Sequence, residues 1–256
     1  MKKFFICAAL ALCAAAFVLL GRSDTSSKDK NENYAAADTL SGKRVLPVYG
    51  VERSDKAVAL TIDAAWGADK TPEILDILKT KGVKATFFLV GRWVREFPDQ
   101  ARAIVAAGHL VGSHSDSHPH FCSLSNDQIA AELKAAEDAI VTIGGQKPVY
   151  FRAPFGEYDD RVVQKLRDSG YQVIQWTIDT LDWKEDRTAG QVLEVVFRKI
   201  APGVIILCHN NANSITEYLP ALIDELLSEG YTFVTVDQLV YPGFNIDNNG
   251  IQHPQS

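Results

Sequence analysis

The residues of this chain that could do chemistry gather in five short clusters, and each cluster follows an apolar run. The clusters are Asp63, His114 with His118, Arg152 to Phe155, Asp179 to Trp183, and His209. Two histidines separated by three residues lie on one face of a helical turn, which suits a single metal ion. The five clusters together predict an active site of ionisable side chains, provided that the fold brings them to one place.

Each cluster also has a bland structural interpretation. The histidine pair could lie exposed in a polar loop, and His120 could compete as a ligand. Arg152 could make a structural ion pair with Asp159 or Asp160, and His209 could be a satisfied core residue at the end of an apolar strand. All of these interpretations would have to hold at once for the active-site hypothesis to be wrong.

Apolar runs and helical patterns alternate from Val45 onward, and this alternation indicates how the clusters are positioned. The predicted strands are residues 58–62, 85–90, 109–113, 149–152, 171–178, 204–208 and 231–236. The predicted helices are residues 71–81, 98–107, 125–143, 159–169, 188–200 and 215–229. About seven β–α units with continuous apolar strands predict an α/β fold with parallel strands, best matched by a distorted (β/α) barrel. Active sites of such folds lie at the carboxyl ends of the strands, where all five clusters fall.

The amino-acid composition argues against some binding partners, and its variation along the chain predicts separate segments. Of 256 residues, 46% are hydrophobic, which suits a packed domain, and the net charge of −6 argues against binding nucleic acid or anionic lipid surfaces. Two lysines followed by an apolar run predict a signal peptide or signal anchor over 1–21, so we expect an extracytoplasmic protein that touches a membrane only through this segment. We further predict a flexible tether over 22–44, the barrel over 45–243 and a disordered tail over 244–256. Pairing of Cys122 with Cys208 stays open.

The clusters resemble, in order, the motifs of the polysaccharide (NodB-type) deacetylases. The matching segments are Thr61 to Ala64, His114 to His118, Arg152 to Phe155, Asp179 to Trp183, and Leu207 to His209. The resemblance covers residues 55–240, nearly the whole predicted domain. The segment from Asp63 to Gly67 is most similar to the sporulation-associated branch.

The resemblance implies hydrolysis of an acetamide on an N-acetylated cell-wall glycan, such as peptidoglycan or a chitin-like oligosaccharide, with release of acetate. By resemblance, Asp63 is the general base, and His114 and His118 hold a divalent metal such as zinc or cobalt. His209 is the general acid, and its partner Asp182 raises its pKa. Arg152 is implied to orient Asp63 or a neighbouring carboxylate, and the backbone N–H of Phe155 to contact the oxyanion. Trp183 and Leu207 are implied to contact the acetyl methyl and a sugar face.

The first motif departs from the family pattern because Ala64 stands where the family has a metal-binding aspartate. Three outcomes follow: Asp63 shifts to the metal, Asp116 or another group substitutes, or the metal binds weakly and catalysis is low or lost. The last outcome makes a glycan-binding or spore-envelope protein the alternative to an enzyme. A third hypothesis is hydrolysis of O-acetyl esters or of another amide by the same set of residues.

Overall fold

A computed structural model of the chain describes residues 44–243 and 245–254. The predicted signal segment 1–21, and the predicted tether except Arg44, lie outside these residues. Within the described ranges, no helix has both the length and the apolar character needed to cross a bilayer. The strands are β1 (Gly50–Val51), β2 (Ala57–Ala64), β3 (Thr86–Leu89), β4 (Leu110–Ser113), β5 (Tyr150–Phe151), β6 (Gln172–Val173), β7 (Ile178–Asp179), β8 (Ile205–His209), β9 (Thr232–Val234) and β10 (Ile251–Gln252).

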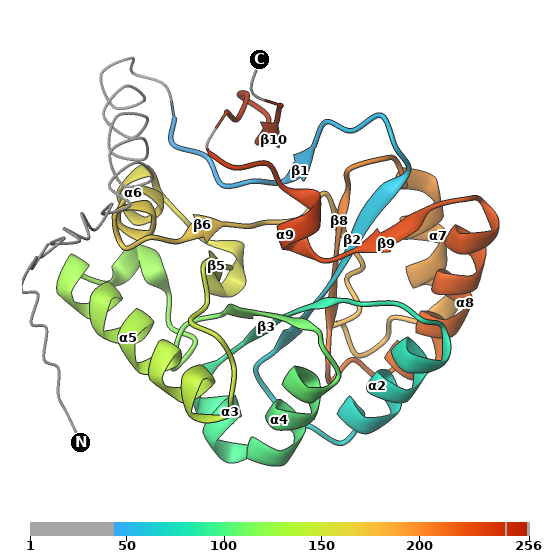
Figure 1. The fold of residues 1–256 in the computed structure, drawn as a ribbon, viewed down its shortest axis with the longest axis horizontal. Helices are drawn as coiled ribbons and strands as arrows, with labels where there is room; N and C mark the ends of the chain where they lie inside the picture. The colour runs from blue at the N-terminus through green and yellow to red at the C-terminus, as the bar shows by residue number, and fades with distance from the viewer. Residues whose placement is uncertain (1–43, 244, 255–256) are drawn as a thin grey trace, which may run out of the picture.

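Eight of these strands form one curled parallel sheet with β2 near its middle (Figure 1). The order along the sheet is β6-β5-β4-β3-β2-β8-β7, and β9 pairs with the first half of β2. Every pairing in this sheet is parallel, because each strand is followed by a crossover segment. The prediction of a distorted (β/α) barrel is confirmed.

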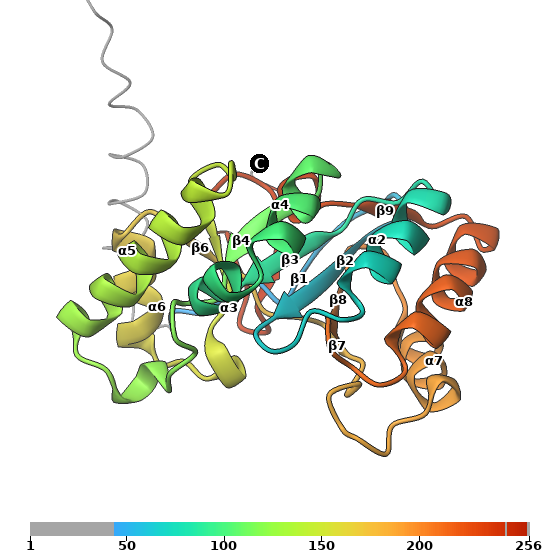
Figure 2. The ribbon, with the colours of Figure 1, turned by 90° about the horizontal axis from the view of Figure 1, so that it is seen from below.

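Most helices cover the outer face of the sheet, whereas the short α9 packs in the core cluster on its inner face (Figures 1 and 2). The helices are α2 (Thr71–Thr80), α3 (Gly91–Glu96), α4 (Pro98–Ala106), α5 (Asn126–Thr142), α6 (Asp160–Asp168), α7 (Ala189–Lys199), α8 (Ile215–Ser228) and α9 (Val236–Leu239). Their starts follow from local sequence: Pro72 lies in the first turn of α2, and a reciprocal capping box of Ser125 and Gln128 begins α5. The short helices α3 and α9 were not predicted, and α9 ends the predicted strand 231–236 early because Thr235 caps it.

Side chains alternate between the two faces of β2, and this alternation determines the face on which Asp63 lies. Leu60 and Ile62 belong to the core cluster under the helices, whereas Ala59 belongs to the cluster on the opposite face, inside the barrel. Because successive side chains of a strand point to opposite faces, Asp63 shares the interior face with Ala59. The sequence of β2 therefore places one carboxylate over the barrel interior.

The predicted strand 171–178 is in fact two strands, β6 and β7, at opposite ends of the sheet path. Between them the chain crosses the gap and is held by backbone hydrogen bonds from Gln175 N to Val48 O (2.7 Å) and from Thr177 N to Ile205 O (3.0 Å). Most side chains of the crossing segment, residues 174–177, are buried or half-buried. The sequence of residues 171–178 therefore has the same apolar pattern as a single continuous strand. This segment closes the barrel and delivers Asp179 to the same mouth as β8.

The prediction of a disordered tail is wrong for residues 245–254. Strand β10 pairs with β1 in parallel, with Gly50 opposite Ile251. Gln252 is fully buried and its amide donates to the carbonyl oxygens of Tyr241 (2.7 Å) and Gly243 (2.9 Å). The polar composition of this segment conceals a structure that rests on backbone and amide hydrogen bonds together with burial of Ile246 in the core cluster on the inner face of the sheet.

Candidate active site

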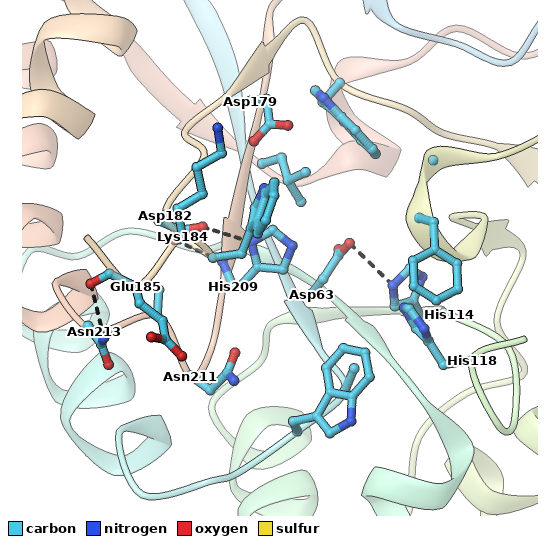
Figure 3. A pocket seen from close by; sticks show the side chains of 18 of the residues that line it. Asp63, His114, His118, Asp179, Asp182, Lys184, Glu185, His209, Asn211 and Asn213 are labelled. Carbon is cyan, nitrogen blue, oxygen red and sulfur yellow. Dashed lines mark hydrogen bonds and ion pairs between the residues drawn. The ribbon is translucent and has the colours of Figure 1, made fainter. Parts of the chain in front are cut away.

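The carboxyl ends of β2, β4, β5, β7 and β8 surround one pocket of about 650 Å³ (Figure 3). The structure brings all nine predicted site residues together: Arg152 lies buried behind Asp63, and the others line the pocket, namely Asp63, His114, His118, Phe155, Asp182, Trp183, Leu207 and His209. Asp63 and His209 are register partners on neighbouring strands. Figure 3 shows Asp63 between His209 on one side and His114 with His118 on the other.

Asp63 is held by a fully buried arginine. Arg152 Nη1 donates to Asp63 Oδ1 (2.7 Å) and to Thr61 Oγ1 (2.9 Å), and its Nη2 donates to Gln175 O (3.0 Å). The guanidinium also lies over the ring of Phe88, 4.2 Å from its centre. Burial opposes ionisation of Asp63, but the charge of Arg152, with help from His114 and His209, holds the pKa of the carboxyl below its ordinary value. The pocket therefore contains an ionised carboxylate.

The alternative ion pairs proposed for Arg152 do not form. Asp159 caps α6 by accepting from Val162 N (2.7 Å), and Asp160 lies 3.9 Å from Arg44. Both carboxylates are thus occupied outside the pocket.

The two histidines of the second cluster, His114 and His118, are neighbours, with ring centres 4.8 Å apart. His114 Nδ1 is 2.8 Å from Arg152 O, and its Nε2 is 3.5 Å from Asp63 Oδ2. Burial lowers the pKa of both imidazoles, that of His118 to about 3, so both are neutral near pH 7. The segment between them is not helical as the spacing predicted, because Ser115 and His118 have left-handed backbones with φ of 71° and 62°.

Glu132 on α5 holds this left-handed loop. Its carboxylate accepts from the backbone N–H groups of Asp116 and Ser117 and from the Ser117 hydroxyl, at 2.6 to 2.8 Å. Asp116 itself is paired with Arg95 through both oxygens (2.8 and 2.9 Å), so it does not substitute for the missing metal ligand. His120 is paired with Glu157 (2.8 Å) and does not line the pocket.

The side chains here supply some of the ligand atoms that a divalent cation needs, but one anionic ligand is missing. His114 presents Nε2, and the buried Nδ1 of His118 has no hydrogen-bond partner among the described residues. Ala64 is fully buried and supplies no ligand atom, and no group of three candidate ligands within residues 44–243 and 245–254 is arranged to hold an ion. Asp63, already bound by Arg152, is the carboxylate beside the imidazoles. Neutral imidazoles are good zinc ligands, so His114 and His118 would hold a metal here, with fewer anionic ligands than the family pattern provides.

On the other side of Asp63, His209 is paired with a buried carboxylate. His209 Nδ1 lies 2.7 Å from Asp182 Oδ1, and the other Asp182 oxygen accepts from His209 N (3.0 Å) and from the Tyr218 hydroxyl (2.6 Å). Burial lowers the pKa of His209, but Asp182 outweighs it and the pKa lies above its ordinary value. This imidazole therefore keeps its proton to higher pH than a free histidine does.

The rest of the pocket supplies apolar contacts and one further acid. Leu207 is buried and lines the pocket, while Trp183 and Phe155 are exposed at its mouth. Phe155 has a left-handed backbone (φ 59°), and its N–H makes no hydrogen bond to the described residues. Asp179, which begins the fourth predicted cluster but was given no role, also lines the pocket, and burial raises the pKa of its carboxyl.

Two supporting residues could not have been found from local sequence. Glu132 and Tyr218 lie on helices α5 and α8, far along the chain from the residues they bind. Asp179, by contrast, was within reach of sequence reasoning and begins the fourth predicted cluster, because it stands directly at the end of β7.

Sequence and fold comparisons agree with this arrangement. The polysaccharide deacetylase family model matches residues 50–174. The Bacillus subtilis protein named peptidoglycan-N-acetylmuramic acid deacetylase PdaA is 32% identical, and the match spans 73% of this chain and 72% of PdaA. The chain belongs to the polysaccharide deacetylase family.

Solved structures include a relative of a different kind. BA3943 from Bacillus anthracis, described as a CE4 family pseudoenzyme, is 38% identical with a TM-score of 0.73, covering 82% of this chain and 73% of that one. A BA3943 mutant described as having restored enzymatic activity is 40% identical with a TM-score of 0.72, covering 81% and 72%. The chain is thus similar both to a named deacetylase and to a pseudoenzyme.

Proposed function

We propose that this protein removes acetyl groups from the N-acetylated sugars of a cell-wall glycan. The observation that supports this most directly is that one pocket holds Asp63, whose pKa is lowered, beside His209, whose pKa is raised, on neighbouring strands. An amide is a poor electrophile with a poor leaving group, so its hydrolysis needs a base for the attacking water and an acid for the departing amine. The similarity to peptidoglycan deacetylases supports the glycan as substrate.

In the proposed reaction Asp63 takes a proton from water as the water oxygen bonds to the acetamide carbon. The backbone N–H of Phe155 donates to the oxyanion that forms. His209 then gives its proton to the amine nitrogen as the C–N bond breaks, which leaves acetate and a free amino sugar. A divalent metal held by His114 and His118 would polarise the acetamide oxygen when bound. Arg152 orients Asp63 and keeps it ionised until the water attacks.

The pH dependence of acetate release tests the acid. Activity should fall as pH rises through the raised pKa of His209, because the proton donor is then lost. In Asp182→Asn the carboxylate that raises this pKa is absent, so we expect the alkaline limb to move down by about one pH unit or more. The position of the alkaline limb is measured from initial rates of acetate release from N-acetylglucosamine oligomers between pH 5 and 10. An unmoved alkaline limb would exclude His209 as the acid.

Metal dependence tests the two imidazoles. We expect a chelator to reduce acetate release, and added zinc or cobalt to restore it. His114→Ala should bind less zinc at equilibrium and respond little to added metal, whereas His253→Ala, at a half-exposed histidine outside the pocket, should behave as the unaltered protein. Equal zinc binding by His114→Ala and the unaltered protein would contradict the assignment.

A second candidate function is glycan binding without turnover. Ala64 and the similarity to BA3943 favour it, because the first motif lacks one anionic ligand. The two functions separate in one experiment: acetate release from peptidoglycan and from N-acetylglucosamine oligomers, with zinc or cobalt present. Release supports the deacetylase, and binding of the same oligomers without release supports the second candidate.

We also infer that the protein works outside the cytoplasm, in the envelope and in connection with sporulation. The N-terminal charge and apolar pattern, the peptidoglycan substrates in the names of relatives and the resemblance of the first motif to the sporulation-associated branch support this. Fractionation of growing and sporulating cells tests it, and recovery of the protein in the cytoplasm at both stages would contradict it.

A further inference from the structure

The turn at residues 154–157, which contributes Phe155 and Gly156 to the pocket, has an unusual backbone. Phe155 and Gly156 are both left-handed, with φ of 59° and 69°, a conformation that glycine adopts readily and phenylalanine rarely. A left-handed residue with a side chain persists only where the surrounding structure holds it. Because the proposed reaction uses the N–H of Phe155 for the oxyanion, the groups that hold this turn also set where that donor lies.

Gln175 holds the turn from its buried side. Its side-chain nitrogen Nε2 donates to Gly156 O (2.9 Å). Only the amide nitrogen can donate to a carbonyl oxygen, so this contact fixes the orientation of the side chain. Gln175 is 1% exposed, and the hydrogen bond is therefore shielded from solvent.

The backbone of Gln175 is bound at the same time to Arg152. The carbonyl oxygen of Gln175 accepts from Arg152 Nη2 (3.0 Å), and Arg152 Nη1 donates to Asp63 (2.7 Å). One buried residue of the crossing segment therefore contacts both the arginine that orients the base and the turn that carries the oxyanion donor. A change of its side chain alone would release the turn and leave the contact with the arginine in place.

His120 holds the same turn from its exposed side. Its imidazole stacks on the ring of Phe155, with ring centres 4.3 Å apart and an angle of 14° between the planes. Its Nδ1 lies 2.8 Å from Glu157 Oε2. The turn is thus bound at Phe155 and Glu157 by His120 and at Gly156 by Gln175.

We propose that Gln175 and His120 are positioning residues of the deacetylation reaction, which hold the turn at residues 154–157 from two sides and keep Phe155 left-handed. The inference rests on the proposed function, because the oxyanion contact from Phe155 is part of that reaction. Gln175 also leaves a buried acceptor unpaired, since its Oε1 has no hydrogen-bond partner among residues 44–243 and 245–254. An unpaired buried oxygen costs stability, so the contact with Gly156, and not the packing of the core, accounts for an amide at this position.

Gln175→Met tests the buried contact, because methionine has a similar shape and cannot donate to Gly156 O. We expect kcat for acetate release from the N-acetylglucosamine tetramer to fall about tenfold, part of the roughly 10² to 10³ that one oxyanion donor contributes, with KM changed less than about twofold. The midpoint of thermal unfolding should not fall, since the unpaired Oε1 is removed with the amide. The matched control is Gln172→Met, at a half-buried glutamine of β6 whose Nε2 has no partner among the described residues, and it should keep the kcat of the unaltered protein.

Hydrogen exchange of backbone amides, followed by NMR without substrate, reports on the turn itself. Gly156 N and Glu157 N each donate, at 3.1 Å, to the carbonyl oxygen three residues earlier. In Gln175→Met and in His120→Ala we expect these two amides to exchange about fivefold faster or more, because the turn opens more often. They should exchange at the unaltered rate in Gln172→Met. His120 is exposed, so His120→Ala carries this test alone if Gln175→Met does not fold.

Unchanged exchange of the two turn amides in both variants overturns the proposal, and so does a Gln175→Met protein that loses stability but keeps its kcat. The two readouts also separate this proposal from that of the enzyme. If the unaltered protein releases no acetate while both variants exchange faster, the enzyme proposal fails and the hold on the turn stands. If the unaltered protein releases acetate and Gln175→Met has the same kcat, the positioning role fails alone.

Discussion

Asp63→Asn should reduce acetate release by a factor of about 10² to 10⁴, the range that a general base contributes. The amide oxygen of asparagine can still accept from Arg152 Nη1, now 2.7 Å from the carboxylate, so the side chain keeps its position. It cannot take a proton from water. Rates of acetate release from N-acetylglucosamine oligomers and from peptidoglycan measure the effect.

The matched control is Asp69→Asn, since Asp69 is exposed on the neighbouring loop and does not line the pocket. It should release acetate at the rate of the unaltered protein. Glycan binding by Asp63→Asn should survive, because the aromatic contacts remain. Full activity in Asp63→Asn would show that another group activates the water.

Arg152→Met should lower the free energy of unfolding by about 3–5 kcal/mol, the usual cost of leaving one member of a buried ion pair alone. Arg152 is fully buried, and Asp63 would be left without the charge that holds its pKa down. The large effect follows from this burial, since an exposed ion pair contributes about 1 kcal/mol or less. Urea unfolding at pH 7 measures it.

Arg102→Met is the matched control because Arg102 makes an exposed ion pair with Asp99 on α4. Its unfolding free energy should change by less than about 1 kcal/mol. The double variant Asp63→Asn/Arg152→Met should be more stable than Arg152→Met alone, since no unpaired charge is then buried. An Arg152→Met protein as stable as the control would show that water or another cation reaches Asp63.

Sequence reasoning predicted that the candidate site residues meet, because each stands at or near the end of an apolar strand and parallel strands bring their ends together. It also expected Arg152 to contact Asp63, and the two side chains are hydrogen-bonded. It did not detect that residues 171–178 change partners halfway, because an apolar run carries no information on which strand it pairs with. Backbone left-handedness at Ser115 and His118 was equally hidden, since its cause, the Glu132 carboxylate, lies on a helix that follows the loop.

The buried pair of Asp63 and Arg152 also bears on how such a protein would evolve. A lineage that no longer needed turnover would still be selected to keep both residues, because losing either one endangers folding. His118 is only half-buried and its Nδ1 has no partner within the described part of the chain, so drift could replace it at little cost to stability. Its survival beside Ala64 is therefore a better sign of retained function than the survival of the ion pair.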